Sequence, residues 1–501
     1  MSAVSLSDVF VALSNRLRER NAIASRHLTL SYEDMIARAA RSARELRERG
    51  VRPGSNVGIA SRDGGETIVL MIAVWMLGAT AVPMDFRTRP GERAARAREF
   101  DLVTIVEDRS FPGVPDYTSV LADRSWTDLI ARHDRRPLFH GGPPAPALIT
   151  LSSGTTGAPM GFVFDHERLL ALFLCGLETC IVKIGERMLS AIPLSYPGSR
   201  NRTLAALLQG STVFFHPPLF SAEEFAEGVL STKATFTFAV PTIISGLLDI
   251  YGERSAPVFN DLQTFACAGA PMSGLEKKRA KAALSEHFLE CYASSMCGGI
   301  TISYGADIDT HADAVGRALP YVSLQIVDDN DEPLPPGEPG ILRARTPGMA
   351  RTIYGAGTRA GGDRIKDGWV YPGDLGLVDK DGYLTFLGRS SDMIIRAGAN
   401  VHPSEVEAAL AECAGVREAA VVGFAAPREG EEIAAFVVAD GDVTEATLIA
   451  HCRDRLVPDK RPRKFVFVSE LPRNASGKLV RKELRERLER NDAPVGSDKA
   501  G

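Results

Sequence analysis

The first half of the chain alternates two hydrophobic patterns. Between residues 30 and 260, stretches with apolar residues at helical spacing are followed by short runs rich in β-branched residues. SYEDMIARAARSARELRERG (31–50) predicts a helix that ends at Gly50, and NVGIAS (56–61) predicts a strand. A second pair follows in TIVLMIAVWMLG (67–78) and LVTIVE (102–107). This alternation is typical of parallel sheets covered by helices.

Two apolar segments bear on membrane association. The uncharged run from Ile68 to Met84 is almost long enough to span a bilayer, but Gly78 and Pro83 interrupt it. A buried helix followed by a short buried strand fits this run better. The N-terminal segment MSAVSLSDVFVALSNRLRERNAIAS lacks the basic start and apolar middle of a signal peptide, and predicts an amphipathic helix. We therefore expect a cytoplasmic protein with no membrane partner.

The pattern changes from about residue 311. Short strands separated by turns, as in LQIVDDNDEPLPPGEPGILRAR (324–345) and YLTFLGR (383–389), predict a small antiparallel or barrel-like unit. After Arg389, a compact α+β pattern follows. It comprises a helix in PSEVEAALAEC, strands in REAAVVGFA and EIAAFVVA, and a helix in EATLIAHCRDRL. The final segment NDAPVGSDKAG is polar and contains proline and glycine, which is typical of disorder.

The predicted fold class is α/β with three parts. A large N-terminal domain of helix-covered β-sheets with a small β-barrel-like unit spans 1–389. A small mobile α+β cap domain spans 390–488, and a disordered tail spans 489–501.

Composition limits the classes of partner. Of the 501 residues, 45% are hydrophobic and 24% charged, as in an ordinary soluble globular protein. The net charge of −5 gives no basic field for nucleic acid. Seven cysteines are scattered along the chain without metal-ligand spacing, which indicates a reducing compartment and predicts no tightly bound metal.

The clearest candidate for chemistry is the loop in LSSGTTGAPMG (151–161). Glycines and small hydroxyl residues follow an apolar run, so backbone N–H groups and hydroxyls are left free to contact an anion. Phosphate loops normally add a lysine, and the matching place here holds Met160.

Two further stretches carry charged side chains at the ends of predicted strands. Asp374 follows a tight turn and can hold the two hydroxyls of a ribose, while Arg389 can neutralise a phosphate. LPRNASGKLVRKEL delivers Lys478 after a Ser-Gly turn. Taken singly, each residue has a structural explanation, such as turn formation for Asp374 and a solvated surface position for Lys478.

In this order and at these separations, the motifs resemble those of the superfamily of adenylate-forming enzymes, which includes acyl-CoA ligases, luciferases and the adenylation domains of peptide synthetases. The resemblance runs from about residue 30 to residue 488. LSSGTTGAPMG matches the phosphate loop, ACAGAPMSG is similar to the segment beside the adenine, and YASSM stands where YGxTE is usual. YPGDL, GRSSDMI, GANVHPSEVE and PRNASGK follow in sequence.

The resemblance implies a reaction in two steps. A carboxylate attacks the α-phosphate of ATP, and a thiol, usually that of CoA, then displaces AMP after the cap domain rotates. Ser391 would lie in the hinge, Gly398 would line the pantetheine tunnel, and Lys478 would reach the α-phosphate and the carboxylate in the first step. The residues implied to bind the adenylate are Ser152, Ser153, Gly154, Thr155, Thr156, Gly157, Gly269, Ala270, Pro271, Tyr292, Ser295, Asp374 and Arg389.

Two positions depart from the family pattern. Met160 replaces the lysine of the phosphate loop, and Met296 replaces the glutamate that helps to hold Mg²⁺. Methionine offers neither charge nor a hard oxygen ligand. Both departures fall on the pyrophosphate half of ATP and spare the groups implied to hold AMP and CoA. We therefore expect thioester formation from acyl-adenylate and CoA, with weak or lost adenylation.

Other functions stay open at this point. A complete ATP-dependent carboxylic acid–CoA ligase remains an alternative, and so does a carrier-protein loading enzyme or a non-catalytic adenylate-binding protein. The expected cofactors are CoA and AMP (as acyl-adenylate), while the use of ATP and Mg²⁺ is left open. A separate adenylating ligase is a candidate partner.

The resemblance also places the wall of the acyl pocket. Small residues there suggest room for a bulky acid, and the absence of an acidic residue disfavours an amino acid substrate. The pocket residues implied are Tyr196, Ser199, Arg200, Phe238 and Ala293. His166, after the phosphate loop, is expected to begin a helix rather than to act as a base.

Overall fold

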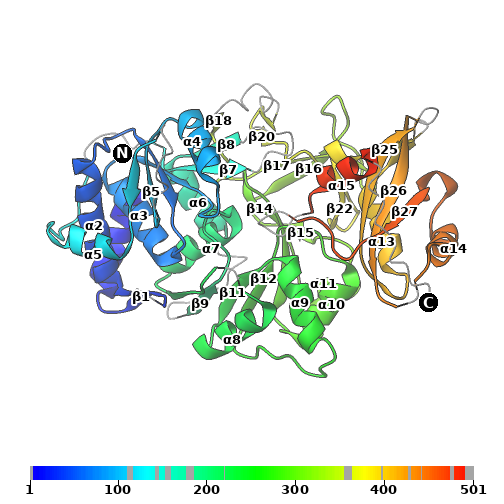
Figure 1. Ribbon diagram of the computed structural model, residues 1–501, viewed down its shortest axis with the longest axis horizontal. Helices are drawn as coiled ribbons and strands as arrows, with labels where there is room; N and C mark the ends of the chain where they lie inside the picture. The colour runs from blue at the N-terminus through cyan, green and yellow to red at the C-terminus, as the bar shows by residue number, and fades with distance from the viewer. Residues whose placement is uncertain are drawn as a thin grey trace.

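The computed structural model describes residues 4–26, 28–109, 117–140, 146–152, 160–176, 186–218, 220–354, 364–396, 399–426, 430–441, 443–473 and 479–490. Four β-sheets and the helices packed on them make up this part of the chain (Figure 1). The α/β fold predicted from the sequence is confirmed.

The first sheet has seven strands and a parallel centre. Neighbours among its last five strands run parallel, whereas β8 and β18 add antiparallel pairs at one edge. In spatial order the strands are β18 (Thr352–Tyr354), β8 (Met160–Phe164), β7 (Leu148–Ser152), β4 (Thr80–Pro83), β3 (Asn56–Ala60), β5 (Leu102–Glu107) and β6 (Ser119–Leu121).

The second sheet has nine strands, and parallel pairs join those from β13 to β1. In spatial order the strands are β15 (Arg317–Ala318), β14 (Gly298–Tyr304), β13 (Phe288–Ser294), β12 (Thr264–Cys267), β11 (Phe236–Ala239), β9 (Arg187–Ser190), β10 (Thr212–Phe215), β1 (Asn21–Ala24) and β2 (Thr29–Ser31).

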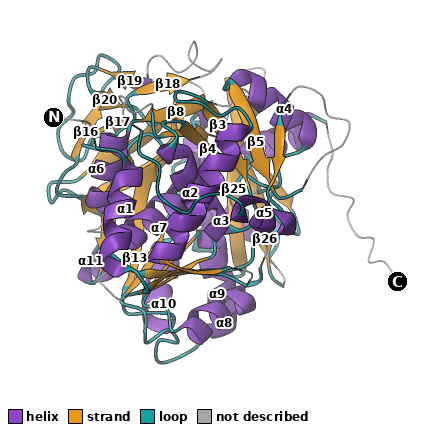
Figure 2. Ribbon diagram, turned by 90° about the vertical axis from the view of Figure 1, so that its left-hand side faces the viewer, coloured by secondary structure: helices purple, strands orange, loops and turns teal. Residues whose placement is uncertain are grey.

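One hydrophobic core joins these two sheets through a layer of helices. Figure 2 looks onto this layer, with α8, α9 and α10 at its lower edge, where they cover the other face of the nine-stranded sheet. The helices of the shared layer are α1 (Leu6–Leu17), α2 (Tyr32–Glu48), α3 (Gly64–Met76), α5 (Arg124–Ala131), α6 (His166–Gly176) and α7 (Pro197–Leu208). The remaining helices of this half are α4 (Pro90–Glu99), α8 (Ala222–Thr232), α9 (Pro241–Tyr251), α10 (Gly274–Ala283) and α11 (Ala306–Thr310).

The apolar run from Ile68 to Met84 folds as predicted. Helix α3 is buried along nearly its whole length, and after Gly78, at φ +66°, the chain enters the fully buried strand β4. Helix α1 is amphipathic, as expected, with Leu6, Phe10 and Val11 buried. In the described ranges, no helix combines the length and the apolarity needed to cross a bilayer.

The third sheet is the small antiparallel unit expected after residue 311. All of its pairs are antiparallel, and it presents the start of β21 beside the end of β22. Its strands are β16 (Ser323–Val327), β17 (Gly340–Arg345), β19 (Ile365–Lys366), β20 (Trp369–Val370), β21 (Asp374–Val378) and β22 (Leu384–Arg389).

The fourth sheet has hydrophobic clusters of its own and forms the right-hand end of the molecule in Figure 1. Helix α15 extends to Glu489, and the predicted disordered tail lies outside the described residues from position 491 onward. The elements are β23 (Ile394–Arg396), β24 (Ala399–Val401), β25 (Val416–Ala426), β26 (Gly430–Ala439), β27 (Lys464–Phe467), α13 (Pro403–Ala411), α14 (Glu445–Arg455), α15 (Arg481–Glu489) and the short 3₁₀ helix η4 (Pro458–Lys460).

Candidate functional site

Asp374, Arg389 and Tyr292 meet at the junction of two sheets. Asp374 begins β21 and pairs in register with Arg389 at the end of β22. Tyr292 comes from β13 of the nine-stranded sheet, and its hydroxyl donates a hydrogen bond to Asp374 Oδ2 at 2.5 Å. Arg389 Nε lies 3.0 Å from Asp374 Oδ1. Three candidates from three motifs, carried by two sheets, therefore form one cluster.

One oxygen of the Asp374 carboxylate, Oδ1, remains available to accept a hydrogen bond. Asp374 is only 3% exposed, yet no described donor is aligned to hydrogen-bond its Oδ1, despite the nearby Arg389. Burial raises the pKa of Tyr292 well above its usual value, and Asp374 adds to the rise, so this phenol remains a donor. Buried polar atoms normally find partners. A buried carboxylate oxygen that is ion-paired but lacks an aligned hydrogen-bond donor can accept a hydrogen bond from a ligand hydroxyl.

Two arginines line the turn before Asp374. Arg364 Nη1 and Arg389 Nη1 both donate to the carbonyl of Pro372, at 2.8 and 2.9 Å. Burial lowers the pKa of Arg364, as does Arg389, while Asp374 opposes the change. This concentration of positive charge around one carboxylate suits an anionic ligand such as a phosphate.

The segment expected beside the adenine follows the end of β12. Gly269 has φ +116°, and an added Cβ would meet only Val240 at 3.7 Å, so backbone conformation rather than space requires glycine here. Ala270 and Pro271 continue this turn, and Ser295 lies in the turn after β13. Because β12 and β13 are parallel, their carboxyl ends share one edge of the sheet, where α/β proteins commonly bind ligands.

The phosphate loop lies mostly outside the described residues. Ser152 ends β7, whereas Ser153, Gly154, Thr155, Thr156 and Gly157 fall in the undescribed range 153–159. Met160 begins β8, pairs with Ser152 and packs against the shared core. Gly398 and Lys478 also lie outside the described residues.

Met296 has a clear structural role. Its side chain is 2% exposed and belongs to the core that joins the two large sheets. Its carbonyl accepts a hydrogen bond from Ala350 N at 2.6 Å. The side chain at this position therefore supplies apolar packing and no oxygen ligand for Mg²⁺.

The predicted hinge lies between the third and fourth sheets. Ser390–Asp392 forms a single 3₁₀ turn, η3, in which Ser391 is exposed. Ser390 N donates to Gly373 O at 2.9 Å, and Asp392 accepts from Arg485 of α15 at 3.1 Å. The turn thus contacts both neighbouring units, while its function as a hinge stays a prediction.

Four of the five residues expected to line the acyl pocket lie at or beside the start of α7, and the fifth, Ala293, is exposed on β13. Tyr196 precedes the helix, Ser199 Oγ donates to Ile192 O at 2.7 Å, and Phe238 is buried on β11. Ala293 follows a register shift in β13.

Arg200 is the unusual member of this group. It is 1% exposed, and its Nη2 donates to Thr150 Oγ1 at 2.7 Å. Burial lowers its pKa to about 9. No described carboxylate forms an ion pair with it, so its hydrogen bonds within the described chain all go to neutral groups.

Arg202 escaped the sequence analysis. Its guanidinium lies 4.5 Å from the centre of the Phe238 ring, and its Nη1 donates to Gly198 O at 3.2 Å. The available signal was a pair of arginines two residues apart, followed directly by the largely apolar run TLAALL (203–208).

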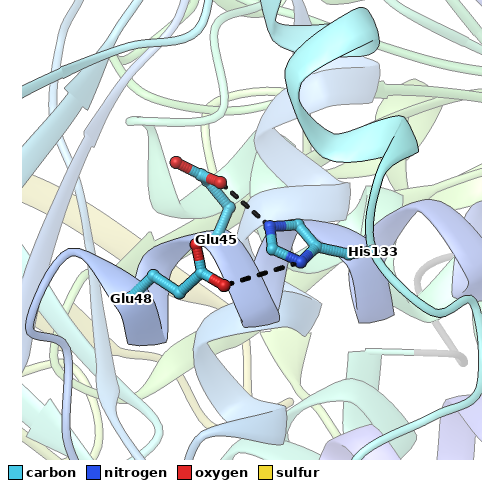
Figure 3. Close-up of side chains that lie close together, drawn as sticks. All are labelled: Glu45, Glu48 and His133. Atoms are coloured by element: carbon cyan, nitrogen blue, oxygen red, sulfur yellow. Dashed lines mark hydrogen bonds and ion pairs between the residues drawn. The ribbon is translucent and has the colours of Figure 1, made fainter.

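A group that resembles a metal site lies elsewhere. Glu45 and Glu48 of α2 face His133, whose Nε2 is 2.9 Å from Glu45 Oε2 (Figure 3). Arg49 and Arg132 contact Glu45 at 2.7 and 2.6 Å. Burial acts to raise the pKa of Glu45, but the hydrogen bonds from His133, Arg49 and Arg132 together lower it. Because cations already neutralise the carboxylates, this cluster is an ion-pair network rather than a metal centre.

His166 begins α6, as the sequence predicts, and is structural. Its side chain is 2% exposed, its Nδ1 accepts a hydrogen bond from Leu6 N at 3.1 Å, and its ring meets Trp75 edge-on at 6.0 Å. Burial lowers its pKa to about 4, while Asp165 opposes the shift. The accepting Nδ1 requires neutral imidazole, so His166 ties the N-terminal helix to the shared core.

We expect His166 to make folding sensitive to acid. The unfolded imidazole takes up a proton near pH 6.5, whereas the folded one stays neutral down to about pH 4. Acidification from pH 7.5 to pH 5 should therefore lower the free energy of unfolding by about 2 kcal/mol through this group. Urea unfolding at both pH values measures the effect. His166→Gln should reduce the pH dependence by that amount, whereas His287→Gln, at an exposed position, should leave it unchanged; an equal pH dependence in wild type and His166→Gln would contradict this role.

Comparison with known proteins gives a consistent result. The sequence profile of the AMP-binding enzyme family matches residues 11–354, and that of the AMP-binding enzyme C-terminal domain matches residues 405–478. The chain is 30% identical over 483 residues to a feruloyl-CoA synthase of Amycolatopsis sp, covering 93% of this chain and 96% of that protein. It is 29% identical over 485 residues to the long-chain-fatty-acid–CoA ligase FadD13 of Mycobacterium tuberculosis, covering 92% and 94%.

Solved structures agree in fold. ATP-bound MatB from Rhodopseudomonas palustris superposes with a TM-score of 0.87 at 25% identity, covering 97% of this chain and 99% of that one. The o-succinylbenzoate CoA synthetase MenE of Bacillus subtilis, in complex with its acyl-adenylate intermediate, superposes with a TM-score of 0.86 over 96% and 99%. Its identity is 24%, so it shows the fold alone.

Proposed function

Since the chain belongs to the AMP-binding enzyme family and is an acid–thiol ligase of the acyl-CoA ligase type, we propose that it forms acyl-CoA thioesters from acyl-adenylate and CoA, with a weakened adenylation step. In this proposal the acyl-adenylate, which a complete ligase forms as its own intermediate, enters this enzyme as a substrate. A separate adenylating ligase would supply it.

The observation that carries the proposal is the contrast between two halves of the nucleotide site. On the AMP side, Asp374 Oδ1 is a buried acceptor without an aligned donor, and Tyr292 and Arg389 hold its carboxylate in place. On the pyrophosphate side, Met296 is packed into the core and Met160 begins a strand. The residues present therefore fit an adenylate, and positions 160 and 296 do not fit Mg-bound pyrophosphate.

The size of the expected defect follows from the chemistry that the two methionines cannot supply. Removing one charge-assisted contact to a leaving phosphate costs about 2–4 kcal/mol, or about 10²–10³ in rate. Two such removals at one transition state approach about 10⁴, allowing for non-additivity. Thioester formation releases AMP and no pyrophosphate, so neither methionine slows the second step.

Each remaining residue has a proposed task. Asp374 holds the ribose, Arg389 the phosphate edge, and Lys478 the α-phosphate and carboxylate. Rotation of the cap domain (390–488) about Ser391 would bring Gly398 and its loop to the thiol. CoA, when bound, supplies the thiol that displaces AMP.

A complete ATP-dependent ligase is the second candidate. The feruloyl-CoA synthase and the long-chain-fatty-acid–CoA ligase that match nearly the whole chain are named for the formation of CoA thioesters, and the MatB structure contains ATP. This function requires other groups to stabilise the departing pyrophosphate.

Two reactions run side by side distinguish the candidates. One mixture contains free acid, ATP, Mg²⁺ and CoA; the other contains synthetic acyl-adenylate and CoA, and both are followed by the mass of the thioester. We expect thioester from the adenylate at least about 100-fold faster than from the free acid. Similar rates in the two mixtures would establish a complete ligase, and no thioester from any adenylate would overturn the proposal.

A further inference from the structure

The start of α7 concentrates buried polar atoms that lack partners. Between residues 195 and 202, Ser195 Oγ, Arg200 Nε, Asn201 Oδ1 and Arg202 Nε are all buried without a hydrogen bond to any described residue. Native proteins leave few such atoms, and each one calls for an explanation. One of these four atoms lies just before α7, and the other three lie within one turn of the helix. This concentration of unpaired polar atoms indicates a ligand that carries polar groups of its own.

Arg202 is the member of this group best placed to contact a ligand. It is 8% exposed, its guanidinium lies over the ring of Phe238, and its Nη1 is held by the Gly198 carbonyl. Stacking uses the face of the guanidinium and leaves the N–H groups at its edge directed away from the ring. Its position is thereby fixed while the Nε–H remains unpaired.

Arg202 lies next to a residue of the expected acyl pocket, Phe238. It approaches the Cys291 thiol, whose pKa is raised by burial and lowered in part by this arginine. Cys291 directly precedes Tyr292, which binds Asp374, and Phe238 belongs to the predicted pocket wall. Arg202 therefore lies beside Phe238 of the predicted pocket wall and against β13, the strand that carries Tyr292 of the adenylate cluster (Tyr292, Asp374 and Arg389).

The charge of this region is not balanced by protein carboxylates. The buried acid on β13, Glu290, pairs with Lys277 at 2.6 Å, and Asp374 pairs with Arg389. Within the described ranges, neither Arg200 nor Arg202 forms an ion pair with an acidic residue. Removing a guanidinium from water without a counter-charge is costly, so an anion is the ligand that this helix start favours.

We propose that Arg202 binds a second anionic group on the acid, so that the enzyme prefers dicarboxylic acids over monocarboxylic acids of the same size. The first carboxylate is activated as the adenylate, and the second accepts hydrogen bonds from Arg202, with Arg200 adding positive charge behind it. This inference rests on the proposed function and names the substrate class for that site.

The test compares two non-reacting adenylate analogues by calorimetry. Glutaryl-sulfamoyl adenosine carries a free carboxylate, and pentanoyl-sulfamoyl adenosine is the neutral chain of equal carbon number. A charge-assisted contact predicts that the glutaryl compound binds about 10-fold or more tightly. Arg202→Met should abolish that preference by weakening the binding of the glutaryl compound alone, and Arg202→Lys should retain part of the preference.

A matched control separates the anion contact from general packing. Arg345 also stacks on an aromatic ring, 4.5 Å from the centre of Trp369, and it lies on β17, outside the adenylate cluster. Arg345→Met should leave the preference intact, and thermal unfolding of each variant checks folding. Equal binding of the two analogues by wild type, or a preference that survives in Arg202→Met, would overturn the inference and leave the proposed function standing. If wild type binds neither analogue, both the inference and the proposed function are overturned.

Discussion

Replacing Met160 by lysine and Met296 by glutamate together should raise the rate of ATP–pyrophosphate exchange about 10²- to 10⁴-fold. The two side chains restore, respectively, a cation and a hard oxygen ligand on the pyrophosphate side of the site. Exchange of labelled pyrophosphate into ATP measures this step without CoA. Thioester formation from acyl-adenylate should change little, because no pyrophosphate leaves.

The structure adds a consequence for stability. Met296 is buried in the core, so Met296→Glu places a carboxylate among apolar side chains. A buried unpaired carboxylate costs several kcal/mol, and we expect a lower Tm that MgATP partly restores. Met160→Leu with Met296→Leu is the matched control and should leave exchange at the wild-type level. If the folded Met160→Lys/Met296→Glu variant shows no gain in exchange, the two methionines are not the cause of weak adenylation.

Replacing Asp374 by alanine should lower kcat/KM for thioester formation from acyl-adenylate about 10²- to 10³-fold. The substitution removes the proposed acceptor for the ribose, and it takes away the carboxylate that the Tyr292 hydroxyl and the Nε of Arg389 contact. The assay is the initial rate of thioester formation at several adenylate concentrations. Asp374→Asn should be milder, because the amide oxygen still accepts a hydrogen bond.

The chain contains a near copy of this cluster for comparison. Tyr383 donates to Asp307 Oδ1 at 2.7 Å, and Arg317 lies 3.6 Å from the same oxygen. Asp307→Ala removes a similar Tyr–Asp–Arg contact outside the adenylate cluster, and it should cost stability without an effect of this size on kcat/KM. Equal decreases in kcat/KM from Asp374→Ala and Asp307→Ala would show that Asp374 acts through folding alone.

Local patterns predicted much of the fold. The helix ending near Gly50, the buried segment from α3 to β4 and the antiparallel unit after residue 311 all follow from spacing and turn residues. These features depend on neighbours within a few residues, and such neighbours are visible in the sequence.

The site was only partly predictable, because its contacts are long-range. Asp374 and Arg389 stood out by motif, but the hydrogen bond from Tyr292, 82 residues away, depends on how two sheets meet. The burial of Met296 and the stacking of Arg202 on Phe238 likewise depend on packing between distant strands. The sequence singled out Met296 as a departure and missed Arg202, since a charged residue in a helix is ordinarily assigned to the surface.

The most direct test of the account compares two rates in one preparation of the wild-type enzyme. These are ATP–pyrophosphate exchange with a given acid, and thioester formation from the adenylate of that acid and CoA. We predict that exchange is slower by at least about 100-fold, because only adenylation needs the groups missing at positions 160 and 296. Exchange as fast as thioester formation would contradict the account and identify a complete acyl-CoA ligase in which other groups stabilise pyrophosphate.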